Sequence, residues 1–170
     1  MNADYIVTGN LEAGGDALRV TYQLNDVHSG ARLWSRTISP ILEKPNSAAA
    51  EAEVAGRAEG LLIDPILNAE YARLSSKGDI GKTTWGCAVE GYLVGPETAA
   101  RARDCLEAAA QREPSNPNVW RALYWVIDDQ MIWGWGLPPN EASVEKRVQL
   151  GERALQVTPT ISRRWTAEFS

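Results

Sequence analysis

The ten residues SKGDIGKTTW, at positions 76–85, separate two parts of the chain whose apolar residues follow different periods. Strand-like alternation is found within residues 4–38, and from residue 83 onward the spacing is helical throughout. Gly78 and Gly81 can end a preceding helix, and either Thr83 or Thr84 can cap a following one. The stretch therefore predicts a boundary between two structural units.

The same stretch contains Gly-Lys-Thr, the end of the phosphate-binding P-loop motif. That motif requires a glycine at the position of Ser76 and a strand before it. The preceding residues, PILNAEYARL, instead carry apolar side chains at helical spacing. We interpret residues 77–82 as a linker rather than as a nucleotide site.

Upstream of the linker, three segments have the character of strands. ALRVTYQLND (17–26) alternates apolar and polar residues, and four side chains fall on one face: Leu18, Val20, Tyr22 and Leu24. DYIVTGNLEA (4–13) and RLWSRTI (32–38) flank it across glycine-containing turns. The pattern predicts a three-stranded antiparallel meander.

A meander with one apolar face needs a cover, and the alanine-rich segment 47–63 can supply it. Its apolar stripe consists of Val54, Ala58, Leu61 and Leu62. Asn46 or Ser47 can cap this helix, and Asp64-Pro65 predicts a second, short helix over 65–75. Three strands covered by one helix form only a small unit. We therefore expect residues 1–76 to be part of an α/β sandwich whose other strands are absent.

Downstream of the linker, marker residues recur. Three tryptophans are spaced by 35 and 45 residues, namely Trp85, Trp120 and Trp165. Pro114 and Pro159 each precede one of them by six residues. The spacing of Ala102, Leu106, Ala109 and Pro114 matches the second helix of a tetratricopeptide repeat. We predict helical repeats over 83–114 and 115–159, with a third beginning at 160–170, and an α+β fold for the whole.

Longer segments resemble a known family. NADYIVTGNLEAGGDALRVTYQLNDVHSGARLWSRTI resembles the last part of the TolB amino-terminal-like domain. GCAVEGY and RARDCLEAAAQREPSNPNVWRAL resemble the tetratricopeptide repeats that follow it in CadC-like membrane-anchored transcriptional regulators and in class III adenylate cyclases. In this family the DNA-binding or cyclase domain is a separate amino-terminal unit, so the resemblance implies no catalytic residue here.

The resemblance implies a non-catalytic regulatory or sensory module of a bacterial signalling protein, binding a protein, a peptide or a small effector on its repeats. A constitutive scaffold for cell-envelope assembly is the alternative. Family members with a membrane span ahead of this region would place it in the periplasm, and a cytoplasmic location is the other option. Self-association is also left open.

Composition excludes several classes of function. With 17 basic and 22 acidic residues the net charge is −5, and no basic cluster favours nucleic acid. No apolar run approaches the ~20 residues of a membrane span. The single histidine, His28, and two cysteines are too few for a zinc site or a cysteine nucleophile, so we expect no metal and no cofactor. The adjacent Asp128 and Asp129 are expected to form a solvated edge of a helix.

Two sets of residues remain as candidate sites. Cys87 and Cys105 lie nine residues before and after Pro96, which places them level in a helical hairpin. They are either a disulfide pair or two buried thiols. Trp125, Trp133 and Trp135 fall where the second repeat has extra length, and they either form an exposed binding patch or cover neighbouring helices.

Overall fold

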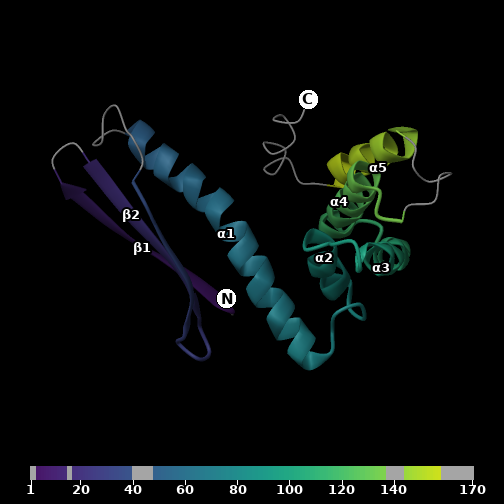
Figure 1. Ribbon diagram of the computed structural model, residues 1–170, viewed down its shortest axis with the longest axis horizontal. Coiled ribbons are helices and arrows are strands. Elements are labelled where there is room, and N and C mark those ends of the chain that lie inside the picture. Colours follow the sequence, from purple (N-terminus) through teal and green to yellow (C-terminus); the bar gives the residue numbers. More distant parts are fainter. Residues whose placement is uncertain (1–2, 15–16, 40–47, 137–143, 158–170) are drawn as a thin grey trace. The chain divides into compact units, whose positions relative to one another are not determined.

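The computed structural model describes residues 3–14, 17–39, 48–136 and 144–157. In these residues three strands are followed by five helices, which confirms an α+β fold with a helical array (Figure 1). The chain divides into two compact units, Met1–Ala69 and Glu70–Ser170, and each is described by itself.

The first unit is built on an antiparallel sheet in the order β1-β2-β3. Its strands are β1 (Tyr5–Gly14), β2 (Ala17–Asp26) and β3 (Arg32–Ile38), as the alternation predicted. The predicted apolar face of β2 is buried in full, with Leu18, Val20, Tyr22 and Leu24 each at most 5% exposed. The opposite face carries polar side chains, such as the Thr21 and Thr37 hydroxyls, which hydrogen-bond at 2.9 Å.

The helix α1 (Ala48–Lys77) covers the buried face. Val54, Ala58 and Leu61 pack against β2, and the Tyr22 hydroxyl donates to the Val54 carbonyl at 2.8 Å. The predicted start of a new helix at Asp64 is wrong, because α1 continues through Pro65. Proline removes one backbone hydrogen bond, but helix-forming residues on both sides outweigh that loss. The proposed caps Asn46 and Ser47 lie outside the described residues.

The boundary between the two units lies within α1, so residues 70–77 belong with the second unit rather than with the sheet. Glu70 explains this, because it accepts a hydrogen bond from Trp85 Nε1 at 2.7 Å and pairs with Arg73. The helix then ends at Lys77, and Gly78 and Gly81 adopt φ of 70° and 72°.

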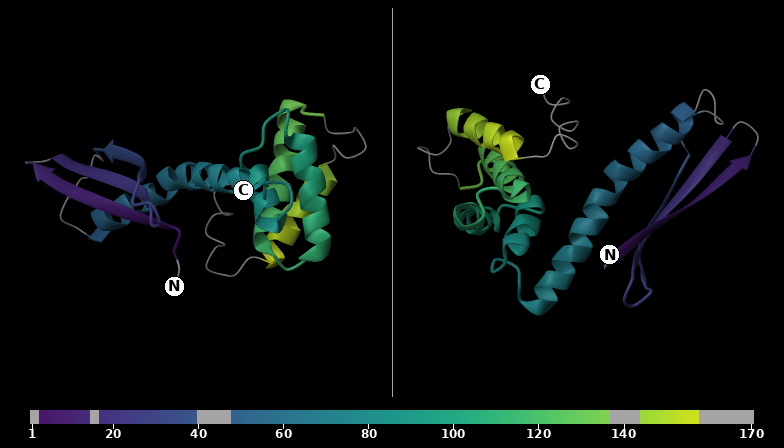
Figure 2. Two further views of the ribbon diagram at one scale, coloured as in Figure 1. Left: turned by 90° about the horizontal axis from the view of Figure 1, so that it is seen from below. Right: turned by 180° about the vertical axis from the view of Figure 1, so that it is seen from behind.

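The second unit is a helical array, seen from two sides in Figure 2. It contains α2 (Thr84–Tyr92), α3 (Ala99–Arg112), α4 (Pro117–Trp133) and α5 (Val144–Val157). Its core includes the repeat positions Ala102, Leu106 and Ala109, all at 0% exposure. A Cβ atom on Gly91 would lie 2.7 Å from Leu106 Cδ1, so glycine permits this close packing of α2 on α3. Pro159, Trp165 and the predicted third repeat lie outside the described residues.

Candidate protein-interaction site

The helix α4 has well-formed ends. Asn116 caps its amino terminus by accepting from the Asn118 amide at 3.1 Å, and Pro117 occupies the first turn, where its missing N–H costs nothing. Gly134 ends the helix in the left-handed conformation, with φ of 69°. The residues on either side of Gly134 are therefore held in a defined geometry.

Large apolar side chains remain exposed along one side of α4, and Trp135, just beyond its end, is half-buried. Trp133 is 64% exposed, Ile132 59% and Trp125 40%. Positions 125, 129, 132 and 133 share one face of a helix. We call Trp125, Ile132, Trp133 and Trp135 the α4 aromatic patch. The structure thus places Trp125 and Trp133 at the surface.

The carboxyl-terminal part of the patch is anchored to the interior. Gln130 is completely buried, and its side-chain amide donates to the Trp135 carbonyl at 3.0 Å. The Trp135 amide donates back to the Gln130 carbonyl at 3.2 Å. The rings of Trp133 and Trp135 stack with centroids 6.3 Å apart and an interplanar angle of 21°. Sequence reasoning missed Gln130, which follows two aspartates and shares their polar character in the sequence.

Trp125 lies two helical turns before Trp133 and is held differently. Its ring packs edge-on against Tyr124, with centroids 5.9 Å apart. Met131, which belongs to the same aromatic run in the sequence, instead packs against the core. The helix therefore sorts this run into an exposed side and a buried side.

Two adjacent carboxylates border the patch. Asp128 is buried and pairs with Arg147 of α5, whose Nε lies 2.9 Å from Oδ1, so the expectation of a solvated Asp128 is wrong. Asp129 lies on the patch side. Partial burial raises its pKa, the neighbouring Asp128 charge adds to this, and a hydrogen bond from Trp133 opposes it. The two carboxylates have different partners and do not form an acid/base pair.

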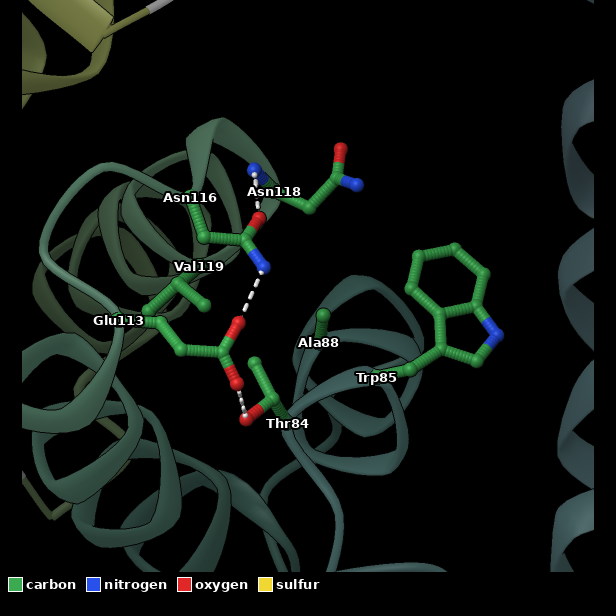
Figure 3. Close-up of a pocket in the computed structure, with 7 residues that line it drawn as sticks. All are labelled: Thr84, Trp85, Ala88, Glu113, Asn116, Asn118 and Val119. Atoms are coloured by element: carbon green, nitrogen blue, oxygen red, sulfur yellow. Dashed lines mark hydrogen bonds between the residues drawn. The ribbon is translucent and has the colours of Figure 1, made fainter.

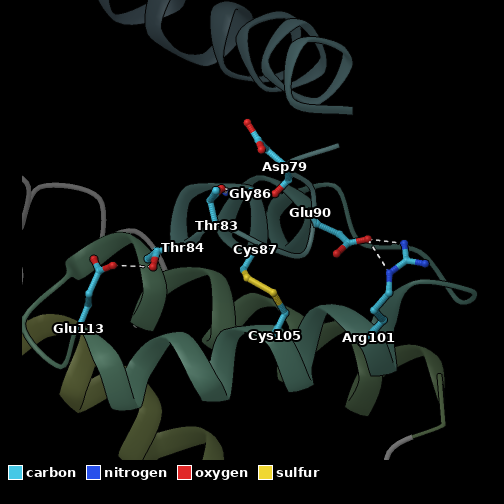
Figure 4. The surroundings of a disulfide bond; sticks show 9 residues. All are labelled: Asp79, Thr83, Thr84, Gly86, Cys87, Glu90, Arg101, Cys105 and Glu113. Atoms are coloured by element: carbon cyan, nitrogen blue, oxygen red, sulfur yellow. Dashed lines mark hydrogen bonds and ion pairs between the residues drawn. A yellow bond between two sulfur atoms is a disulfide. The ribbon is translucent and has the colours of Figure 1, made fainter. Parts of the chain in front are cut away.

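The two cysteines are joined in the structure. Cys87 on α2 and Cys105 on α3 form a disulfide, with their Cα atoms 5.6 Å apart (Figure 4). The ion pair between Glu90 and Arg101 also links these two helices. A hydrogen bond from the Thr84 hydroxyl to Glu113, directly after α3, makes a third connection. Together these contacts connect α2 to α3 near the start, at the middle and just after the end of α3.

A hollow of about 170 Å³ opens between α2 and the start of α4 (Figure 3). Its polar groups bond to one another: Glu113 accepts from Thr84 and from the Asn116 side chain, while Asn116 caps α4. These hydrogen bonds lower the pKa of the Glu113 carboxyl. Because its polar groups serve capping, this hollow is part of the helix junction.

A wider groove of about 530 Å³ lies in the first unit, between β3 and α1. Trp34 and Arg36 line it from the strand, and Leu61, Asp64 and Asn68 line it from the helix. Asn68 is turned toward its own helix, since its side-chain amide donates to the Asp64 carbonyl at 2.8 Å.

The remaining sequence candidates have structural partners. His28 lies in the exposed turn after β2, 3.2 Å from the Asp4 carboxylate. Thr83, from the P-loop-like stretch, caps α2 by accepting from the Gly86 amide at 3.0 Å. Within the described ranges, no three His, Cys, Asp or Glu side chains are placed to share a metal ion. In those same ranges, no helix has the length and apolarity needed to cross a membrane.

Comparison with known proteins yields no match to any family model, curated protein or solved structure.

Proposed function

We propose that this chain is a non-catalytic interaction module of a bacterial signalling protein, and that its helical unit binds a partner polypeptide through the α4 aromatic patch. The observation that carries the proposal is the 64% exposure of Trp133 beside a backbone anchored by the buried Gln130. An exposed tryptophan in a fixed position supplies large contact area at little cost in conformational entropy, and tryptophan is enriched among the residues that dominate binding energy.

The composition of the patch defines the partner. Three indoles and one isoleucine offer an apolar surface, and the Asp129 carboxylate lies among them. A short segment with aliphatic side chains and one basic residue is complementary to this surface, because a basic group can pair with Asp129 or lie over an indole ring. Binding would then alter an attached output domain.

Two observations support a non-catalytic role for these residues. Both cysteines are joined in the disulfide, so neither is available as a nucleophile. The single histidine is paired with Asp4 in a turn of the sheet-bearing unit.

The proposal can be tested by selecting short random displayed peptides on the intact protein. The selected peptides are then titrated into wild type and Trp133→Ala by calorimetry. We expect apolar peptides with a basic residue, and a loss of at least about tenfold in affinity for Trp133→Ala.

Trp85→Ala is the matched control, because Trp85 is a tryptophan on α2 that is 38% exposed and bonds to Glu70 outside the patch. The control should keep full affinity for the selected peptides. Peptides that bind Trp133→Ala as tightly as wild type would show that the patch is not the binding surface.

A further inference from the structure

The two edges of the sheet differ in a way that points to a second interface. The β3 edge is short, contains Arg32 and Arg36, and has an irregular register opposite Leu24 and Asn25. These are the features by which natural sheets discourage pairing with another strand. The β1 edge has ten residues in regular register, with no proline, lysine or arginine among them.

The β1 edge also has an uncovered apolar side. By register, Val7 lies beside Leu24 and Leu11 beside Val20, so both belong to the face that α1 covers over β2. Nevertheless Val7 is 44% exposed and Leu11 58%. In the described residues the sheet ends at β1. The apolar layer beneath α1 therefore continues onto a strand whose outer edge pairs with no other described strand.

The hydrogen-bond phase of β1 shows which backbone groups point outward. The Val27 amide donates to the Asp4 carbonyl at 3.0 Å, and these two residues continue the β1–β2 register. Hydrogen-bonded pairs alternate along antiparallel strands. The N–H and C=O groups on the open edge are therefore those of odd-numbered residues, among them Val7, Gly9 and Leu11.

We propose that β1 pairs antiparallel with β1 of a second copy of this chain, about a two-fold axis at Gly9. In this register the outward-pointing residues at the centre of β1 meet one another, since Gly9 faces Gly9 and Val7 faces Leu11. About six backbone hydrogen bonds form over this central segment, and the apolar residues of both copies fall on the same face. On the other face Thr8 meets Asn10, and Glu12 meets Ile6 rather than another Glu12. This self-complementarity favours a second copy over an unrelated strand.

The first test measures the mass of the full chain by sedimentation velocity across a range of concentrations. We expect a dimer that dissociates in the micromolar range, because a single strand pair gives a small interface. Val7→Lys combined with Leu11→Lys places like charges opposite each other and should weaken the dimer at least about tenfold. Val7→Lys combined with Leu11→Glu places opposite charges there, and it should restore the affinity to within a few-fold of wild type.

The two double variants alter the same exposed positions, so a general loss of apolar surface would affect both equally. Circular dichroism should show the same fold for all three proteins. A wild type that remains monomeric at every concentration overturns the proposal. Equal weakening by both double variants, or no weakening by either, also overturns it.

The register is tested by cross-linking. Across the axis the two Gly9 Cα atoms are about 5.5 Å apart, within the range of a disulfide. A Cβ atom at Gly9 meets only the Thr21 carbonyl oxygen, at 3.7 Å, so Gly9→Cys fits. Oxidation should yield a covalent dimer of Gly9→Cys. Glu12→Cys should not cross-link, since its copies lie about 20 Å apart in this register, and the reverse result would contradict the arrangement.

Discussion

Cys87 and Cys105 lie opposite each other on α2 and α3, with Cα atoms 5.6 Å apart and Cys87 completely enclosed by the core. A sequence separation of 18 residues means that the bond closes a short helical hairpin. The disulfide thereby joins two helices that both contribute to the core of the helical unit. Its removal should lower the stability of that unit.

Reduction of this disulfide should lower the free energy of unfolding of the helical unit by about 3 kcal/mol, because the open chain gains conformational entropy when unfolded. Denaturation followed by tryptophan fluorescence, with and without a phosphine reductant, measures the difference. The double variant Cys87→Ala and Cys105→Ala is the control and should be insensitive to reductant. Two titratable thiols in wild type prepared under air would contradict the bond.

The replacement Gly91→Ala has two opposing effects on stability, a gain in helix propensity and a cost from overpacking the core. Alanine favours a helix interior over glycine by up to about 1 kcal/mol. The added methyl group, however, would meet Leu106 Cδ1 at 2.7 Å, Ala122 Cβ at 3.2 Å and Val126 Cγ2 at 3.3 Å. Overpacking of a core costs about 1–3 kcal/mol, so we expect net destabilisation.

Gly95→Ala provides the comparison for Gly91→Ala in the same denaturation experiment. A Cβ atom at Gly95 has no neighbour within 4 Å, and its φ is not in the left-handed region. This variant should remain within about 0.5 kcal/mol of wild type. A Gly91→Ala protein more stable than wild type would show that the neighbouring core side chains can move to accommodate the added methyl group.

The sequence predicted the elements that have a clear period. Alternation in β2 placed Leu18, Val20, Tyr22 and Leu24 on the buried face, because a half-buried strand leaves that signature. Asp64-Pro65 was misleading, since a proline signal is local whereas the helix through it is stabilised over its whole length. The boundary inside α1 was also missed, because it depends on the contact between Glu70 and Trp85, which are distant in sequence.

The candidate site was only half predictable for a similar reason. The run of aromatic residues around position 133 was visible, but a tryptophan has the same identity whether it covers a helix or faces solvent. Its exposure depends on the end of α4 at Gly134 and on the burial of Gln130 beneath it. Those are tertiary features, and no spacing rule encodes them.

Truncation of two tryptophans on α4 should destabilise the protein to different extents. Trp120 is partly buried, its Nε1 donates to the Pro114 carbonyl at 2.8 Å, and the Arg153 guanidinium lies 5.4 Å from its ring centre. Trp120→Ala should cost at least about 2 kcal/mol of unfolding free energy. Trp133→Ala should cost less than about 1 kcal/mol, because its ring is largely in solvent.

Urea denaturation monitored by circular dichroism compares the two tryptophan variants under one condition. A loss of more than about 2 kcal/mol in Trp133→Ala would assign that ring to the core and weaken its role in binding. Similar losses in both variants would have the same meaning.

Tyr92 should make the stability of the helical unit fall with rising pH in the alkaline range. Burial raises the pKa of its phenol to about 12, with the nearby Arg121 charge opposing the shift, and its hydroxyl donates to the Asn118 carbonyl at 3.3 Å. An unfolded tyrosine ionises near 10, so between pH 10 and 12 only the unfolded state loses this proton. The stabilisation is therefore complete below pH 10, and it is lost as the pH rises toward 12.

The expected loss is about 1.4 kcal/mol per pH unit within that window. Tyr92→Phe keeps the buried ring without the titrating group, so its stability should fall less steeply over the same range. Urea midpoints measured at intervals from pH 9 to pH 11.5 compare the two proteins. Parallel curves for wild type and Tyr92→Phe would mean that the phenol ionises equally well in the folded state, and hence that the core against which Tyr92 packs does not shield it from water.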